Sequence, residues 1–318
     1  MADDAMRAVV QHEFGGPEVL RVERVPRPEP LPTEVLVRVS AAGINPVDWK
    51  TRTGAGMAGV LGAPPFTVGW DVSGVVERVG FGVTTLAAGD EVYGMPWFPR
   101  QAAGYAEYVT APARQFARKP AKATHEQAAA VPLAALTAWQ ALVDTARLTS
   151  GRRVLVHAAA GGVGHFAVQF AKYLGAYVIG TASAGRHEWL SNIGADELID
   201  YHATPFEEAV RDVDIVLDLV GGETGVRSVR TLRPGGLVIA VPGGVSPDLA
   251  AAAQAAGVRA SAFLVEPDGA ALTTIAGLID SGSVTAEVEE VFPLEEAAEA
   301  HRHGERGRTR GKLVLRVS

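Results

Sequence analysis

A glycine-rich turn is the part of the sequence whose residue types and spacing most clearly predict chemistry. Residues 158–164 read AAAGGVG, between an apolar run at 154–156 and a helical pattern that continues to residue 174. Glycines let a backbone approach a pyrophosphate, and the amino end of a helix offers free N–H groups. The turn therefore predicts a dinucleotide site at Gly161, Gly162, Val163 and Gly164, although a purely structural turn could have this sequence. Ala158 stands where a strict glycine pattern has its first glycine, which a negative φ would allow.

The segment after the next predicted strand indicates which dinucleotide is bound. Residues 180–187 read GTASAGRH, with no carboxylate before Glu188. A site for NAD usually places an acidic residue here, on the ribose hydroxyl. Ser183 and Arg186 instead suit a 2′-phosphate, so we expect NADPH. The alternative is a solvated arginine at the start of a helix.

Composition excludes several other functions. The 318 residues are 47% hydrophobic and carry 29 basic against 36 acidic side chains, a net charge of −7. An acidic chain with scattered bases is a poor partner for nucleic acid or an anionic membrane. The absence of cysteine excludes disulfides and thiolate metal sites and fits the cytosol. The acidic start does not resemble a signal peptide, so we expect a cytoplasmic protein.

The pattern of the chain changes near residue 122. Residues 7–120 hold short strand-like runs, at 35–39, 72–76 and 105–109, between glycine and proline turns, which predicts a β-rich, barrel-like domain. Strands and helices then alternate, which predicts an α/β domain with a doubly wound parallel sheet. Its strands are expected at 153–157, 177–180, 197–199, 213–217, 237–240 and 258–265, and its helices include 124–131, 135–147, 163–174 and 186–193. After residue 282 a strand, a helix and a strand follow, which we expect to return to the first domain.

Six segments, taken in order, resemble one enzyme family. They are 42–50 (AGINPVDWK), 68–76 (VGWDVSGVV), 104–108 (GYAEY), 133–142 (LAALTAWQAL), 158–174 (AAAGGVGHFAVQFAKYL) and 308–315 (RTRGKLVL). Together they resemble the medium-chain dehydrogenase/reductase superfamily, in its zinc-free quinone oxidoreductase and enone reductase branch. The resemblance implies a GroES-like catalytic domain at 1–122, joined by 282–318, a Rossmann NADPH-binding domain at 123–281, and a cleft between them.

The resemblance also implies that no metal is bound. Zinc-dependent members have a cysteine where this chain has Asn45, and Gly-His-Glu where it has Gly69-Trp70-Asp71. The third ligand position is near Ala134. Without these ligands we expect no zinc, so the hydride acceptor must already be electron-poor: a quinone, or the activated double bond of an α,β-unsaturated carbonyl.

The catalytic candidates are three residues that follow the Ala-Gly-Ile run at 42–44. The resemblance implies that Lys50 polarises the acceptor's carbonyl and that Asn45 bonds near the nicotinamide ribose. Asp48 is expected to orient the loop. The alternatives are a solvent-facing Lys50 and an Asn45 that merely forms a turn before Pro46.

The resemblance assigns further residues to the cofactor and the substrate. For the cofactor they are Thr137, Tyr201, Val220 with Gly221, Val241 with Pro242, Phe263 and Val265, and Arg310 or Arg308. An aromatic substrate wall is expected from Trp49, Trp70, Trp97 and Phe98; ordinary loop packing is the alternative.

The partners expected are a small-molecule substrate and a second copy of the chain. The strand at 258–265 resembles the edge strand that pairs two subunits in this family, which predicts a homodimer. Two other functions stay open at this stage: a zinc-dependent alcohol dehydrogenase, and a protein that binds NADPH with little turnover.

Overall fold

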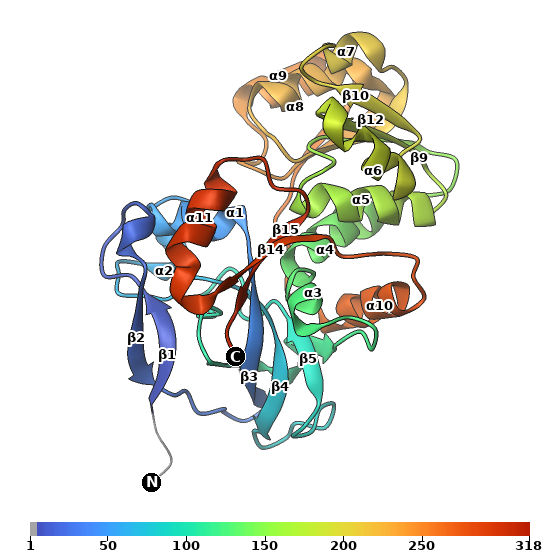
Figure 1. The fold of residues 1–318 in the computed structure, drawn as a ribbon. Helices are drawn as coiled ribbons and strands as arrows, with labels where there is room; N and C mark the ends of the chain where they lie inside the picture. The colour runs from blue at the N-terminus through green and yellow to red at the C-terminus, as the bar shows by residue number, and fades with distance from the viewer. Residues whose placement is uncertain (1–4) are drawn as a thin grey trace. The chain divides into compact units, whose positions relative to one another are not determined.

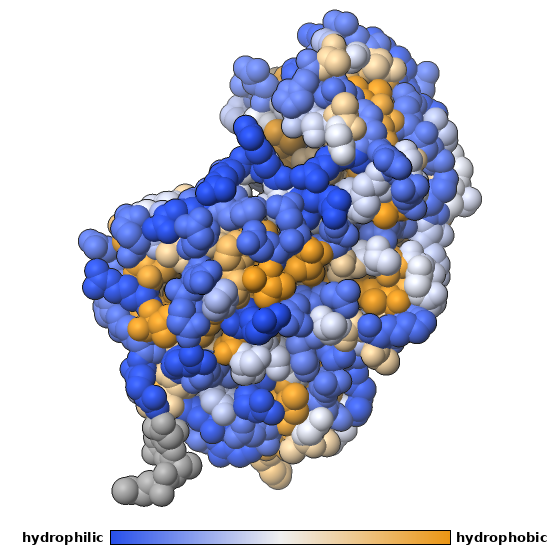
Figure 2. Space-filling model, in the orientation of Figure 1, coloured by the Kyte–Doolittle hydropathy of each residue, from blue (hydrophilic) through white to orange (hydrophobic). Residues whose placement is uncertain are grey.

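The computed structural model describes residues 5–318, which form two compact units (Figure 1). Unit 1 joins residues 5–136 to Glu266–Ser318, and unit 2 is Thr137–Val265. No helix among the described residues is long and apolar enough to cross a membrane. The face shown in Figure 2 is mostly hydrophilic, with scattered hydrophobic side chains.

Unit 1 is built on a mixed sheet that combines strands between residues 34 and 118 with the last two strands of the chain. Its strand order is β14-β15-β3-β4-β5-β7, with β6 also paired to β3. The strands are β3 (Glu34–Ile44), β4 (Asp71–Val79), β5 (Glu91–Gly94), β6 (Tyr108–Pro112), β7 (Phe116–Arg118), β14 (Val288–Pro293) and β15 (Lys312–Arg316). β1 (Ala5–Val10) and β2 (Arg21–Pro26) form a separate antiparallel pair. The strand expected at 105–109 begins only at Tyr108, because residues 105–107 make a single isolated bridge to β1.

The C-terminal segment returns to unit 1 as a strand, a helix and a strand. β14 and β15 are parallel neighbours, with α11 (Ala297–Glu305) between them in sequence, and β15 pairs antiparallel with β3. Alternating apolar residues of β3 and β15, such as Val37 and Leu315, are fully buried in the core of this unit. The helices near the start of the unit are α1 (Pro46–Arg52) and α2 (Ala58–Leu61).

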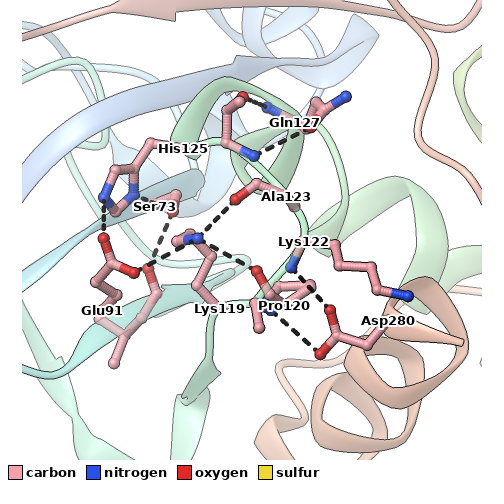
Figure 3. Close-up of polar contacts among 12 residues, drawn as sticks. Ser73, Glu91, Lys119, Pro120, Lys122, Ala123, His125, Gln127 and Asp280 are labelled. Atoms are coloured by element: carbon pink, nitrogen blue, oxygen red, sulfur yellow. Dashed lines mark hydrogen bonds and ion pairs between the residues drawn. The ribbon is translucent and has the colours of Figure 1, made fainter.

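The boundary between the units differs from the expected one. We expected the change at residues 122 and 282, but α3 (His125–Ala129), the start of α4 (Pro132–Trp139) and α10 (Gly269–Asp280) lie in unit 1. Specific contacts hold α10 there: the Tyr93 hydroxyl donates to the Leu272 carbonyl at 2.6 Å. The Asp280 carboxylate accepts the N–H groups of Ala121 and Lys122 at 3.1 and 3.0 Å (Figure 3). Sequence patterns could not show this, because helices of either unit have the same local pattern.

Unit 2 is a six-stranded sheet in which every pair of neighbours is parallel. The order is β10-β9-β8-β11-β12-β13, so successive strands run outwards from β8 first in one direction and then in the other. The strands are β8 (Arg153–Val156), β9 (Tyr177–Ala182), β10 (Glu197–Asp200), β11 (Val213–Asp218), β12 (Leu232–Ala240) and β13 (Arg259–Ala262); the helices are α5 (Gly162–Tyr173), α6 (His187–Asn192), α7 (Phe206–Ala209), α8 (Glu223–Ser228) and α9 (Pro247–Ala256). The predicted doubly wound α/β sheet beside a β-rich domain is confirmed.

Two elements of unit 2 differ in detail from the prediction. The helix expected at 135–147 is α4 followed by a π-helical segment at Gln140–Thr145. The edge strand expected at 258–265 is four residues long, β13, and the chain leaves the sheet at Phe263. The change in direction at β8 is the place where sheets of this type bind ligands, outside the carboxyl ends of the strands.

Candidate functional site

The glycine turn leaves the centre of the unit 2 sheet at the carboxyl end of β8. The Ala159 N–H donates to the Thr181 carbonyl at 3.0 Å, and the Gly161 N–H donates to Ala158 at 2.9 Å. α5 starts directly afterwards, with Gly161 as its N-cap. A Cβ on Gly164 would lie 2.3 Å from the Ala158 carbonyl oxygen, so only glycine lets the helix pack so closely on the turn. The helix start and the bare backbone needed for an anion site are both present.

Ala158 does not have the negative φ that we expected. Its φ is +48°, in the left-handed region that glycine adopts freely and alanine adopts at a cost of about 1 kcal/mol or more. The tight turn therefore keeps the geometry of the glycine pattern, although its first glycine is replaced. The strain shows that the turn is held by its surroundings rather than by local preference.

A buried histidine supplies part of that support. His157 precedes Ala158, and its Nδ1 and Nε2 lie 3.1 Å from Thr181 Oγ1 and 2.9 Å from Ser228 Oγ. The Ser228 hydroxyl donates to the Thr224 carbonyl at 2.6 Å, so its oxygen accepts a hydrogen bond from the Nε2–H of His157. Burial, with a smaller effect of nearby Arg227, lowers the pKa of His157 to about 3. His157 is thus a neutral link between the turn, β9 and α8.

The residues predicted to select NADPH lie on the next strand. Ser183 and Arg186 follow β9, which pairs directly with β8, so both lie at the edge of the sheet that carries the turn. Ser183 caps the short 3-10 turn Ala184–Arg186, and its carbonyl accepts the Arg186 N–H at 2.9 Å. Both residues are half-buried.

Most other cofactor candidates gather at the same sheet edge. Tyr201 follows β10 and is 55% exposed, while Val220, Val241 and Phe263 follow β11, β12 and β13. One carboxylate oxygen of Asp218 accepts the N–H groups of Val220 and Gly221, at 3.0 and 2.9 Å, which fixes that loop.

Three cofactor candidates have different surroundings. Val265 is buried and Thr137 is buried in α4. Arg310 belongs to unit 1, where it forms an ion pair with Glu287.

The catalytic candidates lie in unit 1, where Asn45 is the N-cap of α1 and is 2% exposed. Its Nδ2 donates to Asp71 Oδ2 at 2.9 Å, and its Oδ1 accepts a hydrogen bond from Lys312 Nζ. The ammonium of Lys312 also donates to the Ile44 carbonyl at 2.8 Å and lies 3.5 Å from Asp71 Oδ2. Burial raises the pKa of Asp71 and lowers that of Lys312, and the opposite charge of each partner opposes both shifts. This buried cluster holds a cation and an anion against one amide.

Asp48, which is expected to orient the loop, makes buried hydrogen bonds at the start of α1. Its Oδ2 accepts the Asn45 N–H at 2.7 Å and the Tyr105 hydroxyl at 2.9 Å. Burial raises the pKa of Asp48 to about 7, although both hydrogen bonds oppose the shift.

A chain of hydrogen bonds leads from the surface to Asp48. Arg52 pairs with Glu305 at 2.5 Å and donates to His301 Nδ1 at 3.1 Å. Burial lowers the pKa of His301 to about 3, so its ring is neutral. Because a guanidinium can only donate, His301 Nδ1 accepts from Arg52, and the Nε2–H donates a hydrogen bond to the Tyr105 oxygen, 3.2 Å away. The direction of every hydrogen bond in this chain is therefore fixed.

Lys50 and the aromatic candidates are in contrasting environments. Lys50 is exposed on α1. Trp70 and Phe98 are buried, with ring centroids 5.4 Å apart, and Trp97 Nε1 donates to the Thr110 carbonyl at 2.7 Å. Trp49 packs on His301 with ring centroids 6.1 Å apart. Trp49 and Trp97 are half-buried and pack against the core of unit 1. The aromatic substrate wall stays a prediction.

Sequence reasoning missed Lys312, Tyr105, His301 and Arg52 as supports of the candidate site. The one available signal was Lys312, a cation at the head of the apolar run Leu313–Leu315 in β15. No local pattern links it to Asn45, 267 residues away in the sequence. Among residues 5–318, no group of three or more histidine or acidic side chains could hold a metal ion.

Comparison with known proteins supplies the family. Residues 31–121 match the alcohol dehydrogenase GroES-like domain, and residues 193–315 match the zinc-binding dehydrogenase model. The chain is 35% identical over 321 residues to the 2-methylene-furan-3-one reductase of Solanum lycopersicum, covering 98% of this chain and 79% of that protein. The chain belongs to the medium-chain dehydrogenase/reductase superfamily. The predicted membership is confirmed.

Solved structures of this superfamily agree. The quinone oxidoreductase of Coxiella burnetii is 38% identical, with a TM-score of 0.94 and coverage of 99% of this chain and 100% of that one. The Escherichia coli quinone oxidoreductase, solved as a complex with NADPH, is 30% identical, with a TM-score of 0.88 and coverage of 98% and 100%. Within the superfamily, unit 1 contains the GroES-like fold and unit 2 the Rossmann-type sheet.

His157 should make the stability of this protein depend on pH. Since its pKa is about 3 when folded and about 6.5 when unfolded, the unfolded chain binds more protons between these values, so stability falls as the pH drops. Between about pH 7.5 and about pH 5 the loss from this group is about 2 kcal/mol. Urea unfolding measures this loss: between these two pH values, the free energy of unfolding of His157→Gln should fall by about 2 kcal/mol less than that of the unaltered protein. The control is His202→Gln, which changes an exposed histidine of the same unit. An unaltered pH dependence in His157→Gln would contradict the assignment.

Proposed function

We propose that this protein is a zinc-independent, NADPH-dependent reductase of quinones or of the activated double bond of α,β-unsaturated carbonyls. One observation carries the proposal: the glycine turn with its helix start and the Ser183–Arg186 segment lie on adjacent parallel strands, at the same edge of the sheet. The similarity to the quinone oxidoreductases and the tomato reductase gives the acceptor class.

The residues of unit 2 fit a phosphorylated dinucleotide. Any Cβ on Gly164 would collide with the Ala158 carbonyl oxygen, so glycine at this position lets α5 start directly against the turn, as a pyrophosphate-binding turn requires. The first N–H groups of α5, on Gly162, Val163 and Gly164, have no acceptor within the helix and carry positive potential. Ser183 and Arg186 would hold the 2′-phosphate, and NADPH when bound supplies the hydride.

The residues of α1 act on the acceptor. The proposal assigns to the Lys50 ammonium a hydrogen bond to the acceptor's carbonyl oxygen, where negative charge gathers as hydride adds to the β-carbon. Solvent then supplies the proton that completes the reduction of the double bond. Asn45 donates a hydrogen bond to an oxygen of the bound ligand, and Asp48 holds the loop that carries it.

Zinc-independence is supported by the partners of Asp71. This carboxylate accepts hydrogen bonds from the Asn45 amide and from the Leu133 N–H, and it faces the Lys312 ammonium. The chain has no cysteine, so thiolate ligands are absent from the whole sequence. A zinc-dependent alcohol dehydrogenase is therefore less well supported.

Dimer formation through β13 is part of the proposal. β13 is the last strand of its sheet, so one of its edges has no strand neighbour among residues 5–318, and Leu264 just beyond it is 54% exposed. We expect light scattering to give twice the chain mass of 33.2 kDa. A monomer mass would contradict dimer formation.

The cytoplasmic location stays a prediction. Relatives from mouse and Arabidopsis thaliana are described as mitochondrial and chloroplastic.

Arg186→Ala should separate the two dinucleotides. Loss of the guanidinium removes the charge opposite the 2′-phosphate, so the Kd of NADPH should rise about 10- to 100-fold while that of NADH changes little. Calorimetric titration measures both. Arg230→Ala is the matched control, since this exposed arginine precedes β12 at the opposite edge of the sheet. Equal Kd values for NADPH and NADH in the unaltered protein would refute the preference.

Oxidation of NADPH against a panel of enones, alkenals and quinones, measured with and without EDTA, tests the reaction. We expect turnover with at least one class. Lys50→Ala should lower kcat/KM for a small enone about 10- to 100-fold without changing the Kd of NADPH. The control is Lys122→Ala, an exposed lysine of the same unit. Tight NADPH binding with no turnover would indicate a binding protein, and loss of turnover in EDTA would indicate a metal enzyme.

A further inference from the structure

The buried amide of Asn45 lies between a group that can only donate and a group that can only accept. We propose that Asp71 and Lys312 are positioning residues that fix the orientation of this amide and so aim one of its N–H bonds at an oxygen of the bound ligand. The inference rests on the proposed function and extends it to two residues with no assigned role.

The chemistry of the two neighbours leaves one orientation. The Lys312 ammonium has no acceptor, so the Asn45 atom that it contacts must be the oxygen. The Asp71 carboxylate accepts at 2.9 Å, so the atom that it contacts must be the nitrogen. A flipped amide would place N–H against ammonium and oxygen against carboxylate. Both contacts are buried, where such conflicts are most costly.

The two positioning residues are themselves held. The second oxygen of Asp71 accepts the Leu133 N–H at 2.7 Å, and Lys312 donates to the Ile44 carbonyl at 2.8 Å. Asp71 is 0% exposed and Lys312 is 3% exposed. The amide is thus oriented from β4 and from β15, two strands that both pair with β3.

The arrangement leaves the Asn45 amide with one hydrogen to spare. Its nitrogen carries two hydrogens, and Asp71 takes one. In the proposed reaction, the second hydrogen is the donor to the ligand. Because partners fix the nitrogen before the ligand arrives, no reorientation is needed at binding.

Asp71→Asn tests the positioning with almost no change in volume. The Leu133 N–H keeps the oxygen of the new amide at position 71, so the NH2 group of that amide faces Asn45. The Lys312 ammonium and this NH2 group then compete for the amide oxygen of Asn45. We expect kcat/KM to fall about 10- to 100-fold. The matched control is Asp280→Asn, which alters another carboxylate of unit 1 that accepts two main-chain N–H groups (Figure 3). Unaltered kinetics in Asp71→Asn would overturn the inference.

A residue swap separates positioning from stability. In Asn45→Asp/Asp71→Asn the carboxylate at position 45 accepts from both Lys312 and the new amide, so the net charge and the buried contacts are kept. We expect the Tm, lowered in Asp71→Asn, to recover most of its loss. The kcat/KM should stay low, since the side chain at position 45 no longer carries an N–H. Recovery of kcat/KM together with Tm would show that no side-chain N–H is needed at position 45 and would overturn the inference.

Asparagine labelling gives a readout that needs no turnover. The chain has two asparagines, Asn45 and the exposed Asn192, so selective ¹⁵N labelling yields two side-chain signals. We expect the Asn45 hydrogens to exchange with solvent far more slowly than those of Asn192, and to lose this protection in Asp71→Asn. The Asp71→Asn variant has a third asparagine, at position 71. Its Asn45 signal is the one that is missing from the spectrum of Asn45→Asp/Asp71→Asn. Unchanged protection would overturn the inference, whereas an unaltered protein that reduces no acceptor would overturn the proposed function alone.

Discussion

The buried ion pair of Lys312 and Asp71 is the interaction on which unit 1 depends. A charge without a partner in this interior would cost several kcal/mol, so the ammonium and the carboxylate must be buried together. Lys312 is the first residue of β15 and Asp71 the first of β4, and both strands pair with β3. The pair therefore joins the last strand of the chain to its N-terminal part, at the point where β3 ends just before Asn45.

Unit 2 depends on a different constraint, which is the parallel direction of all its strands. Because every strand ends at the same edge, the loops after β8, β9, β10, β11, β12 and β13 gather there without specific long-range contacts. The few that exist support the central turn: His157 links it to β9 and α8. The cofactor candidates that follow these strands come from separate parts of the sequence and meet at one edge for this reason.

The sequence predicted what local patterns determine. Strand and helix alternation gave the parallel sheet, and the glycine turn was placed correctly between β8 and α5. It could not give the positive φ of Ala158, since an alanine there is compatible with either sign until its surroundings are known. Nor can a sequence pattern show whether an aromatic side chain faces a pocket or the core. Trp70 and Phe98 were expected to line a substrate pocket, and both are buried.

The role proposed for Lys50 follows from the hydrogen bonds that Lys312 already makes. Positive charge is already buried beside Asn45, but the Lys312 ammonium donates to Ile44 and Asn45 and faces Asp71, so it has no hydrogen left for an acceptor. It orients the amide and cannot polarise a carbonyl. The proposed reaction therefore needs a second cation without such partners, and an acceptor that is electron-poor enough to take hydride with the help of one ammonium. Lys50, exposed on the helix that Asn45 caps, meets the first condition. Quinones and conjugated carbonyls meet the second.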